Sequence, residues 1–360
     1  MSRARRIPRW VAPGLAALIA LVALVSIRPP LTLQPFIAQA VAMRFFMAAG
    51  WGALGLLIAL VAIGQRLWAR RTGRTGRRAG LHAAVLAVVL VLVALTHGGI
   101  LVGRGTSMGA LAAMADKTGQ EGITVLTLNT EREDATIQDV AGAATAARAD
   151  VVVLPETTAD YGDRLATALA GTGDAPFTVF SAVSPPLDPD DDTYGPGRID
   201  PVDATTVLVS SRLGDYRQVE GPGGTGRGLV MVEPVDGTGP VIAGAHTYPP
   251  VPGYMALWRT SLTGVAAICQ SPPDGLILAG DLNATRDHGP LRDLHRCASA
   301  GEQAGIGGLA TWPSTTDSTL MGATIDHILV DAAAWRGIAG EVITVPRTDH
   351  RGVVVRLSAR

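Results

Sequence analysis

Residues 150–156 read Asp-Val-Val-Val-Leu-Pro-Glu. The four consecutive apolar residues from Val151 to Leu154 predict a short strand buried on both faces of its sheet, because a half-exposed strand alternates apolar and polar residues. Glu156 comes directly after this run. A carboxylate at the end of a buried strand has few structural uses, so Glu156 is the first candidate for chemistry. The alternatives are a structural hydrogen bond and a contact with a helix N-terminus.

Other apolar, β-rich runs of the chain also lie next to a polar residue. The segments are Thr127-Leu128-Asn129, His246-Thr247, Gly280-Asp281-Leu282-Asn283 and Thr348-Asp349-His350. Strand ends can converge on one cleft, so we expect these side chains to share a site. Further strands are predicted at 205–210, 229–232, 240–245, 324–330 and 352–357, and helices at 137–148 and 254–269. Many strands with fewer helices predict two packed sheets with helices outside.

Residues 1–105 are expected to form a membrane anchor, because they contain thirteen Arg and no Asp or Glu. Their apolar stretches predict three transmembrane helices, since about 20 apolar residues cross a bilayer. The predicted spans are at about 11–27, 45–64 and 82–102. The first is alternatively a signal peptide, but the lack of a small-residue cleavage site favours an uncleaved helix. Three core helices of a soluble domain are disfavoured by the lack of carboxylates. A connector is expected at 106–121 and a soluble domain at 122–360.

The placement of Arg predicts the orientation of this anchor. Four Arg precede the first span and six lie between the second and third, but only Arg28 and Arg44 lie between the first and second. Basic loops stay in the cytoplasm, so an odd number of spans places the soluble domain outside the cell membrane. All 31 Asp and Glu residues follow residue 105, which makes the soluble domain acidic. Lys117 is the sole lysine, which is typical of a GC-rich bacterium.

Three other features have predominantly structural interpretations. The two cysteines of the chain, Cys269 and Cys297, are compatible with a disulfide in an oxidising compartment or with two buried thiols. The acidic, Pro-rich segment 185–203 lacks the Gly and Glu spacing of a calcium loop, so a surface loop is expected. The Gly-rich segment from Gly221 to Gly228 lacks the Lys of a phosphate loop and predicts a hairpin turn.

The polar strand ends suit the hydrolysis of a phosphoester, which needs neutralised phosphoryl oxygens and a deprotonated water. Glu156 and the amide oxygen of Asn129 are hard ligands for Mg²⁺, with Mn²⁺ as an alternative ion; a plain turn-forming role is the other interpretation of Asn129. His350 can act as a general base if Asp326 orients its ring, as in a hydrolase triad with water in place of serine. No role is assigned to His82, His97, His288, His295 or His327.

These segments, in this order, resemble the endonuclease/exonuclease/phosphatase superfamily. The resemblance covers about residues 123–357 and also includes Val207-Leu208-Val209-Ser210-Ser211-Arg212, Thr311-Trp312-Pro313 and Ile325-Asp326-His327-Ile328. It implies an α+β fold, the four-layer α/β/β/α sandwich of the DNase I-like type, here preceded by three transmembrane helices. It also implies a Mg²⁺-dependent hydrolase acting on ester bonds.

The resemblance implies roles for the acidic and amide residues. Asn129 and Glu156 correspond to the metal site, with Asp349 near it. Asp281 and Asn283 match the Gly-Asp-x-Asn signature of the family, which contacts the scissile phosphate or positions the nucleophile.

Two histidines also match the family pattern. His246 matches the histidine that hydrogen-bonds phosphate, and His350 matches the general base oriented by Asp326. The division of acid and base roles between them stays open. His246-Thr247 is more similar to the DNase I, sphingomyelinase and phosphatase branches than to the apurinic endonucleases. Thr324 is a departure, because many relatives have Arg at this place.

The charge of the soluble domain and its expected location outside the membrane indicate the class of substrate. An acidic domain disfavours nucleic acid, which is held through Lys and Arg. A tether to the outer membrane face favours a lipid-linked or small phosphoester. Membrane-anchored bacterial members of the teicoplanin-resistance type are similar in layout, which implies a carrier like undecaprenyl pyrophosphate. The alternatives are an extracytoplasmic nuclease acting on DNA or RNA and a non-catalytic sensor, and intact catalytic positions disfavour the sensor.

Overall fold

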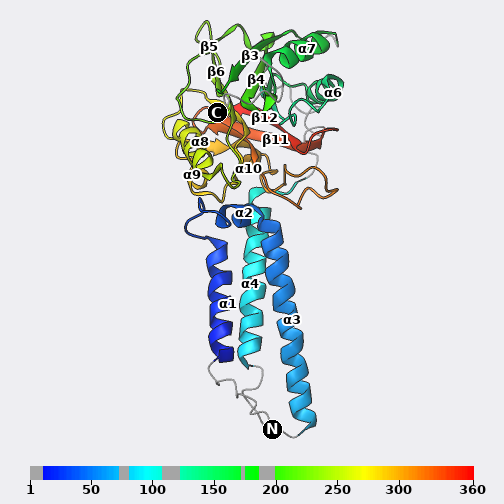
Figure 1. The fold of residues 1–360 in the computed structure, drawn as a ribbon. Helices are drawn as coiled ribbons and strands as arrows, with labels where there is room; N and C mark the ends of the chain where they lie inside the picture. Colours follow the sequence, from blue (N-terminus) through cyan, green and yellow to red (C-terminus); the bar gives the residue numbers. More distant parts are fainter. Residues whose placement is uncertain (1–10, 73–80, 108–121, 172–174, 186–198) are drawn as a thin grey trace.

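Three apolar helices run side by side and carry, at one end, a domain built of two sheets (Figure 1). The helices are α1 (Val11–Ile27), α3 (Arg44–Arg71) and α4 (Leu81–Arg104), with the short α2 (Ile37–Ala42) at the junction with the domain. The computed structural model describes residues 11–72, 81–107, 122–171, 175–185 and 199–360. Most of the expected connector (106–121) and of the acidic segment (185–203) lies outside the described residues.

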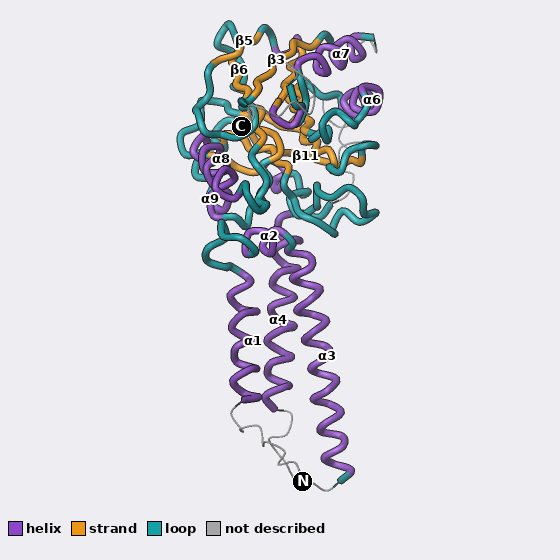
Figure 2. The backbone as a smooth tube through the Cα atoms, in the orientation of Figure 1, coloured by secondary structure: helices purple, strands orange, loops and turns teal. Residues whose placement is uncertain are grey.

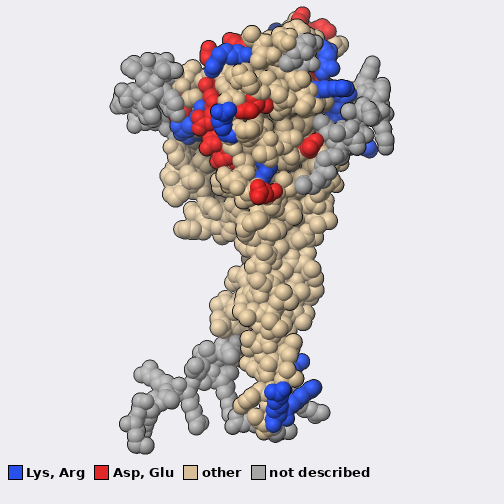
Figure 3. All heavy atoms as spheres, turned by 90° about the vertical axis from the view of Figure 1, so that its right-hand side faces the viewer, with Lys and Arg blue, Asp and Glu red and all other residues tan. Residues whose placement is uncertain are grey.

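Two of the three predicted spans have the length and composition to cross a membrane. They are α3, with 28 residues, and α4, with 24. The first predicted span is not supported to the same degree: α1 has the predicted bounds, but its 17 residues are fewer than the about 20 that a transmembrane helix usually needs. It packs against α4 through Ala23, Leu90 and neighbouring apolar residues. On the face drawn in Figure 3, Arg side chains of the helical part gather at the end far from the domain.

The first sheet has the strand order β11-β12-β1-β2-β4-β3. Its strands are β1 (Ile123–Thr127), β2 (Val151–Pro155), β3 (Phe177–Val183), β4 (Ala204–Ser210), β11 (Trp335–Thr344) and β12 (Arg351–Ala359). β1 and β2 are parallel and the other neighbours are antiparallel. Helices α6 (Ile137–Ala147) and α7 (Ala159–Ala170) cover its outer face (Figure 2). Each helix begins after a threonine, Thr136 or Thr158, whose hydroxyl accepts from a first-turn N–H.

The second sheet has the strand order β5-β6-β7-β8-β10-β9, in which only β7 and β8 are a parallel pair. Its strands are β5 (Tyr216–Val219), β6 (Val230–Pro234), β7 (Ile242–His246), β8 (Ile277–Asp281), β9 (Cys297–Ser299) and β10 (Asp326–Asp331). Helix α8 (Met255–Ile268) covers the outer face, and α9 (Gly289–Arg292) and α10 (Ala300–Gln303) are single turns. Segment 221–228 joins the antiparallel strands β5 and β6, which confirms the predicted hairpin.

The two sheets pack face to face between the helices, which confirms the predicted two-sheet α+β fold. The alternation of side chains along β2 produces this sandwich: Val151 and Val153 enter the core between the sheets. Val152 and Leu154 point the other way, into the core under α6 and α7. All four are fully buried, so the apolar run at 151–154 is explained by a strand that is covered on both faces.

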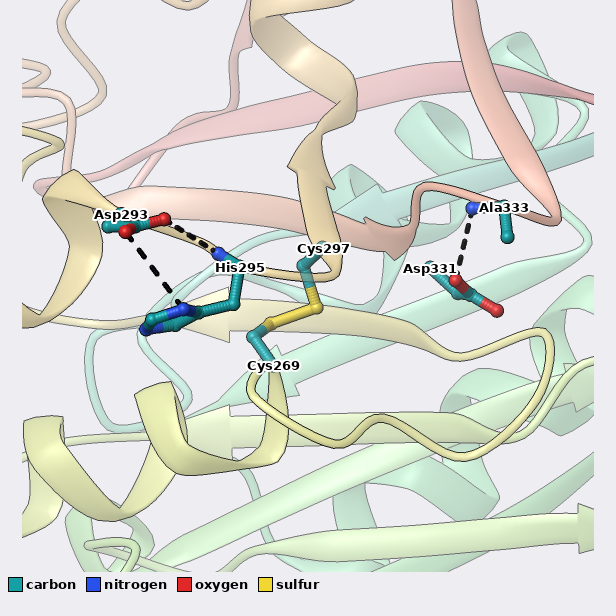
Figure 4. Close-up of a disulfide and its surroundings, with 6 residues drawn as sticks. All are labelled: Cys269, Asp293, His295, Cys297, Asp331 and Ala333. Carbon is teal, nitrogen blue, oxygen red and sulfur yellow. Dashed lines mark hydrogen bonds and ion pairs between the residues drawn. A yellow bond between two sulfur atoms is a disulfide. The ribbon is translucent and has the colours of Figure 1, made fainter.

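A disulfide joins Cys269 to Cys297, whose Cα atoms lie 5.2 Å apart (Figure 4). Cys269 is the C-cap of α8 and Cys297 begins β9, so the bond ties the covering helix to the edge of the second sheet. Both residues are buried. Of the two arrangements compatible with the sequence, the structure has the disulfide.

Replacing Cys269 with serine is expected to lower the free energy of unfolding by about 3 kcal/mol, because the bond closes a loop of about 28 residues in the unfolded chain. Thermal unfolding of the variant and of the wild type, each with and without a reductant, measures the change. The reductant should lower the melting temperature of the wild type alone. If the variant and the wild type had equal melting temperatures without reductant, the disulfide would contribute nothing to stability.

Candidate active site

The pairing of three strands places three predicted site residues in one row across the second sheet. His246 is the last residue of β7 and pairs with Asp281, the last residue of β8. Asp281 in turn pairs with Asp326, the first residue of the antiparallel β10. All three are at most 2% exposed. Their juxtaposition follows from strand register and not from nearness in sequence.

The first sheet contributes residues from the ends of β1 and β2, which meet the row from the second sheet. The Nδ2 group of Asn129 donates to Glu156 Oε1 and to Asp281 Oδ2, each at 3.1 Å. His246 Nε2 lies 3.8 Å from the same two carboxylate oxygens. Asn129 therefore links the two sheets at the centre of the site.

His350, just before β12, faces both Asp326 and Asp281. Its Nδ1 donates to Asp326 Oδ2 at 2.9 Å, and its Nε2 lies 3.7 Å from Asp281 Oδ2. Burial alone would lower the pKa of His350, but the Asp326 and Asp281 carboxylates raise it well above its usual value. The bond to Asp326 fixes the ring so that Nε2 points into the site.

The pKa of His246 is shifted in the opposite direction. Burial, together with the charges of Arg227 and His350, lowers its pKa to about 3. The neutral imidazole of His246 therefore lies across the site from a histidine that favours its protonated form, so the two are suited to different proton-transfer roles.

Asn283 and Glu156 have backbones of positive φ, at 44° and 58° respectively. Asn tolerates this region, but Glu rarely adopts it, and such residues cluster at functional sites. The N–H of Asn283 donates to Asp281 Oδ1 at 2.8 Å and its Nδ2 donates to the Thr247 carbonyl at 2.9 Å. Asn283 thereby holds Asp281 and the end of β7 together.

Asp349 lies at the rim and does not bond directly to Asn129 or Glu156. Its Oδ1 is 3.8 Å from His350 Nε2, and its Oδ2 accepts from Trp312 Nε1 at 2.8 Å. Its backbone N–H donates to Glu131 Oε2 at 2.7 Å. Sequence reasoning did not give roles to Trp312 or Glu131, although Trp312 belongs to one of the family segments.

The site fits a divalent cation on the basis of its donors and its charge. Glu156, Asp281, Asp326 and Asp349 bring four carboxylates together, and among the described residues their ion-pair partners within 4.0 Å are histidines. Burial raises the pKa of both Glu156 and Asp281, as expected for negative charges without enough compensation. Ligand atoms of Asp281, Asp326 and His350 also lie within 4.8 Å of one another. Hard oxygen ligands of this kind suit Mg²⁺.

Thr324, the departure from the family pattern, has a structural contact in place of a charged one. Its hydroxyl donates to the Leu309 carbonyl at 2.5 Å. It also lines a cavity of about 20 Å³ together with Asp326, Thr311 and Arg286. The cavity is large enough for one water molecule, and Arg286 lines it from a different part of the chain.

A two-sheet sandwich with Asn, Glu, Asp and His at its converging strand ends defines the DNase I-like class of phosphoester hydrolases. The profile of the Endonuclease/Exonuclease/phosphatase family matches residues 126–350 of the chain. The chain belongs to this family, whose members are hydrolases of the nuclease and phosphatase type. No curated protein sequence matches the chain.

Solved structures with a similar fold share little sequence with the chain. An endonuclease/exonuclease/phosphatase from Beutenbergia cavernae is 21% identical, with a TM-score of 0.47 over 67% of this chain and 72% of that one. The human Nocturnin catalytic domain is 16% identical, with a TM-score of 0.49 over 67% and 96%. A mannosyl-6-phosphatase from Bacteroides thetaiotaomicron is 16% identical, with a TM-score of 0.45 over 65% and 99%.

Proposed function

We propose that this protein is a membrane-anchored, divalent-metal-dependent phosphoester hydrolase that acts at the outer face of the cell membrane on a lipid-linked or small phosphoester. The observation that carries the hydrolase assignment is the Asp326–His350 pair, which directs His350 Nε2 toward Asp281 and the carboxylate cluster. This arrangement concentrates buried negative charge at Asp281 and Asp326, which is costly for the fold and typical of functional sites.

The proposed metal site consists of Glu156 and Asn129, with Asp349 at its rim. A bound Mg²⁺ or Mn²⁺ would neutralise charge on the phosphoryl oxygens. In the present arrangement the Asn129 oxygen accepts from the Glu131 N–H at 2.9 Å, and its Nδ2 bonds the carboxylates. Exchange of the two amide atoms by rotation would direct the oxygen to the Glu156 side, where it could serve as a ligand.

The remaining residues divide the proton transfers. We assign His350 as the base: with a bound cation offsetting the carboxylates that raise its pKa, its Nε2 would accept the proton of the attacking water while Nδ1–H stays bonded to Asp326. Asp281 and Asn283 are assigned to the scissile phosphate and the nucleophile. His246, neutral and buried, is assigned as the donor to phosphate or to the leaving group.

The anchor is proposed to comprise residues 1–105, followed by a connector at 106–121 and the hydrolase domain at 122–360. α3 and α4 have the length to cross the membrane, and α1 is proposed to lie in the same bilayer because it packs along α4. The Arg-rich end of the bundle lies opposite the domain, which supports a cytoplasmic N-terminus. The Cys269–Cys297 disulfide supports an oxidising compartment for the domain.

The substrate class follows from charge and tethering. All the acidic residues of the chain lie after residue 105, and this charge disfavours a polyanion held through many phosphate contacts. The domain lies directly at one end of the helical bundle (Figure 1), which would place it next to the membrane surface, where phosphorylated lipids are concentrated. A nuclease acting on DNA or RNA is the second candidate, since the family includes nucleases.

The test uses purified full-length protein in detergent or lipid nanodiscs with Mg²⁺ or Mn²⁺. DNA, RNA, phospholipids, a polyprenyl pyrophosphate and small phosphomonoesters are offered side by side, with excess EDTA as the control. Release from a lipid or small phosphoester that EDTA abolishes is the expected result. Cleavage of nucleic acid alone would establish the nuclease, and no release from any substrate would contradict the hydrolase assignment.

The topology has its own prediction. A reporter that is active only outside the cytoplasm, fused after Arg360, should be active in cells, because the domain is proposed to lie across the membrane from the Arg-rich end. The matched control is the same reporter fused after Arg71, at the far end of α3, which should be inactive. The reverse pattern would overturn the proposed orientation.

A further inference from the structure

A buried ion-pair cluster joins the helical bundle to the segment that follows Asn283. Asp287 is 5% exposed and Arg44, at the start of α3, is 4% exposed. Arg44 binds Asp287 through two nitrogens, of which Nε lies 2.9 Å from Oδ2. Arg104, the last residue of α4, also binds both carboxylate oxygens, at 2.8 and 2.7 Å. Burial alone would raise the pKa of Asp287, but the two guanidinium groups lower it to about 2.

The cluster continues into the bundle and ties its three helices together. Arg44 Nη1 donates to His97 Nδ1 at 2.9 Å, which leaves His97 Nε2 to donate to the Ser26 hydroxyl at 3.0 Å. Trp51 Nε1 donates to the same hydroxyl at 3.0 Å. A polar network of this extent inside an apolar bundle requires complete pairing. Asp287 is the carboxylate that both Arg44 and Arg104 bind, and Glu302 Oε1 lies 3.6 Å from Arg104 Nε.

The same short segment is held by two further contacts to the connection between α1 and α3. His288 accepts from the Thr285 N–H at Nδ1 and donates from Nε2 to the Ala38 carbonyl at 3.1 Å. The N–H of Gly289 donates to the Thr32 hydroxyl at 2.9 Å. Residues 287–289 are therefore fixed by the anchor at three successive positions.

The other end of the segment belongs to the active site. Asn283 bonds Asp281 and the Thr247 carbonyl, and its own carbonyl accepts from Trp258 Nε1 at 3.1 Å. The next carbonyl, that of Ala284, accepts from His327 Nε2 at 2.8 Å. Three residues thus separate Asn283 from the carboxylate held by α3 and α4, so only a short stretch of backbone connects the two.

We infer that α3 and α4 are part of the catalytic unit, because Arg44 and Arg104 hold Asp287 and thereby position Asn283 beside Asp281. Asp287 is a positioning residue in this scheme, and the inference rests on the proposed hydrolase function for its effect on turnover. It also gives structural roles to His97, His288 and His327, for which the sequence suggested none. The membrane helices then do more than tether the domain.

The test compares full-length wild type, Asp287→Asn and Arg104→Gln in nanodiscs. Asp287→Asn should lower kcat by about 10²-fold with little change in KM, since a displacement of about 1 Å at a reacting centre can have such an effect. Arg104→Gln, which leaves the Arg44 contact in place, should lower kcat less and keeps the test valid if Asp287→Asn does not fold. The matched control is Asp293→Asn, whose side chain is 78% exposed.

Hydrogen exchange of the peptide covering residues 282–291 gives a readout that does not require activity. Exchange should rise in both variants, while peptides from β1 and β2 stay as protected as in the wild type. Faster exchange with unchanged kcat would show that the cluster is structural only, and unchanged exchange would overturn the inference outright. If the wild type hydrolyses no phosphoester, the proposed function fails, but exchange still decides whether the anchor orders this segment.

Discussion

His350→Ala is expected to lower kcat by about 10²- to 10⁴-fold, the range typical of a lost general base. The physical reason is that Nε2 of His350 is the nitrogen directed into the carboxylate cluster, 3.7 Å from Asp281 Oδ2, while Nδ1 is committed to Asp326. The measurement is kcat for the substrate found in the activity screen, with circular dichroism to show that the variant folds. His295→Ala, with a side chain 48% exposed, is the matched control.

A second variant separates orientation from proton transfer. Asp326→Asn keeps the size of the side chain but removes the carboxylate that fixes the orientation of the His350 ring, so most of the loss should already occur in this variant. The double variant should then be no worse than His350→Ala, because residues that act as a unit are strongly non-additive. The assignment of this pair as the base would be contradicted if the fold-losses in kcat of the two single variants multiplied in the double variant. An unchanged kcat in His350→Ala would contradict it as well.

Glu156→Gln is expected to raise the metal concentration for half-maximal activity by at least about 10- to 100-fold, the range seen even when a residue only supports a metal ligand. The substitution preserves the side-chain length and the oxygen that accepts from Asn129, but it removes a negative charge from a cluster whose pKa values already indicate excess negative charge. Kinetics across a range of Mg²⁺ concentrations would show the shift.

Calorimetric titration with Mn²⁺ gives a second readout for this variant that is independent of turnover. Binding to the wild type should weaken in Glu156→Gln and stay unchanged in Glu233→Gln, a control on β6 whose side chain is 34% exposed. Equal Mn²⁺ affinity in the wild type and Glu156→Gln would place the ion elsewhere, for example among Asp281, Asp326 and His350. The titration thus distinguishes the two ligand sets that the structure offers.

The elements that could be predicted from the sequence are those that are buried and therefore consist mostly of apolar residues. The all-apolar run at 151–154 predicted a strand covered on both faces, and its residues divide between two cores as expected. Strands β3, β5 and β11 and helix α7 were not predicted. β3 and β11 are only partly buried along much of their length, so their sequences lack the strong apolar signal. The first predicted span is a helix with the predicted bounds, but its 17 residues are fewer than the about 20 that a transmembrane helix usually needs.

The site residues likewise divide into those that the sequence predicted and those that it did not. Asn129, Glu156, His246, Asp281, Asn283, Asp326 and His350 were identified from strand ends and from the family pattern, and the structure brings them together. Glu131 and Trp312 bond Asp349 in the structure. Neither residue comes directly after an apolar run, so the pattern that identified the other site residues does not identify these two. Their contacts join segments more than thirty residues apart or from opposite ends of the domain, which no local pattern encodes.

The apolar helices, the buried strands and the chemical types of the site residues follow from local composition and spacing. Which residues share the site depends on the packed fold, because strand register aligns His246, Asp281 and Asp326. It also decided the disulfide and the pairing of Asp287 with Arg44 and Arg104. Partners of this kind are brought together by packing of distant elements, and a buried charge shows its partner only when the chain is folded around it.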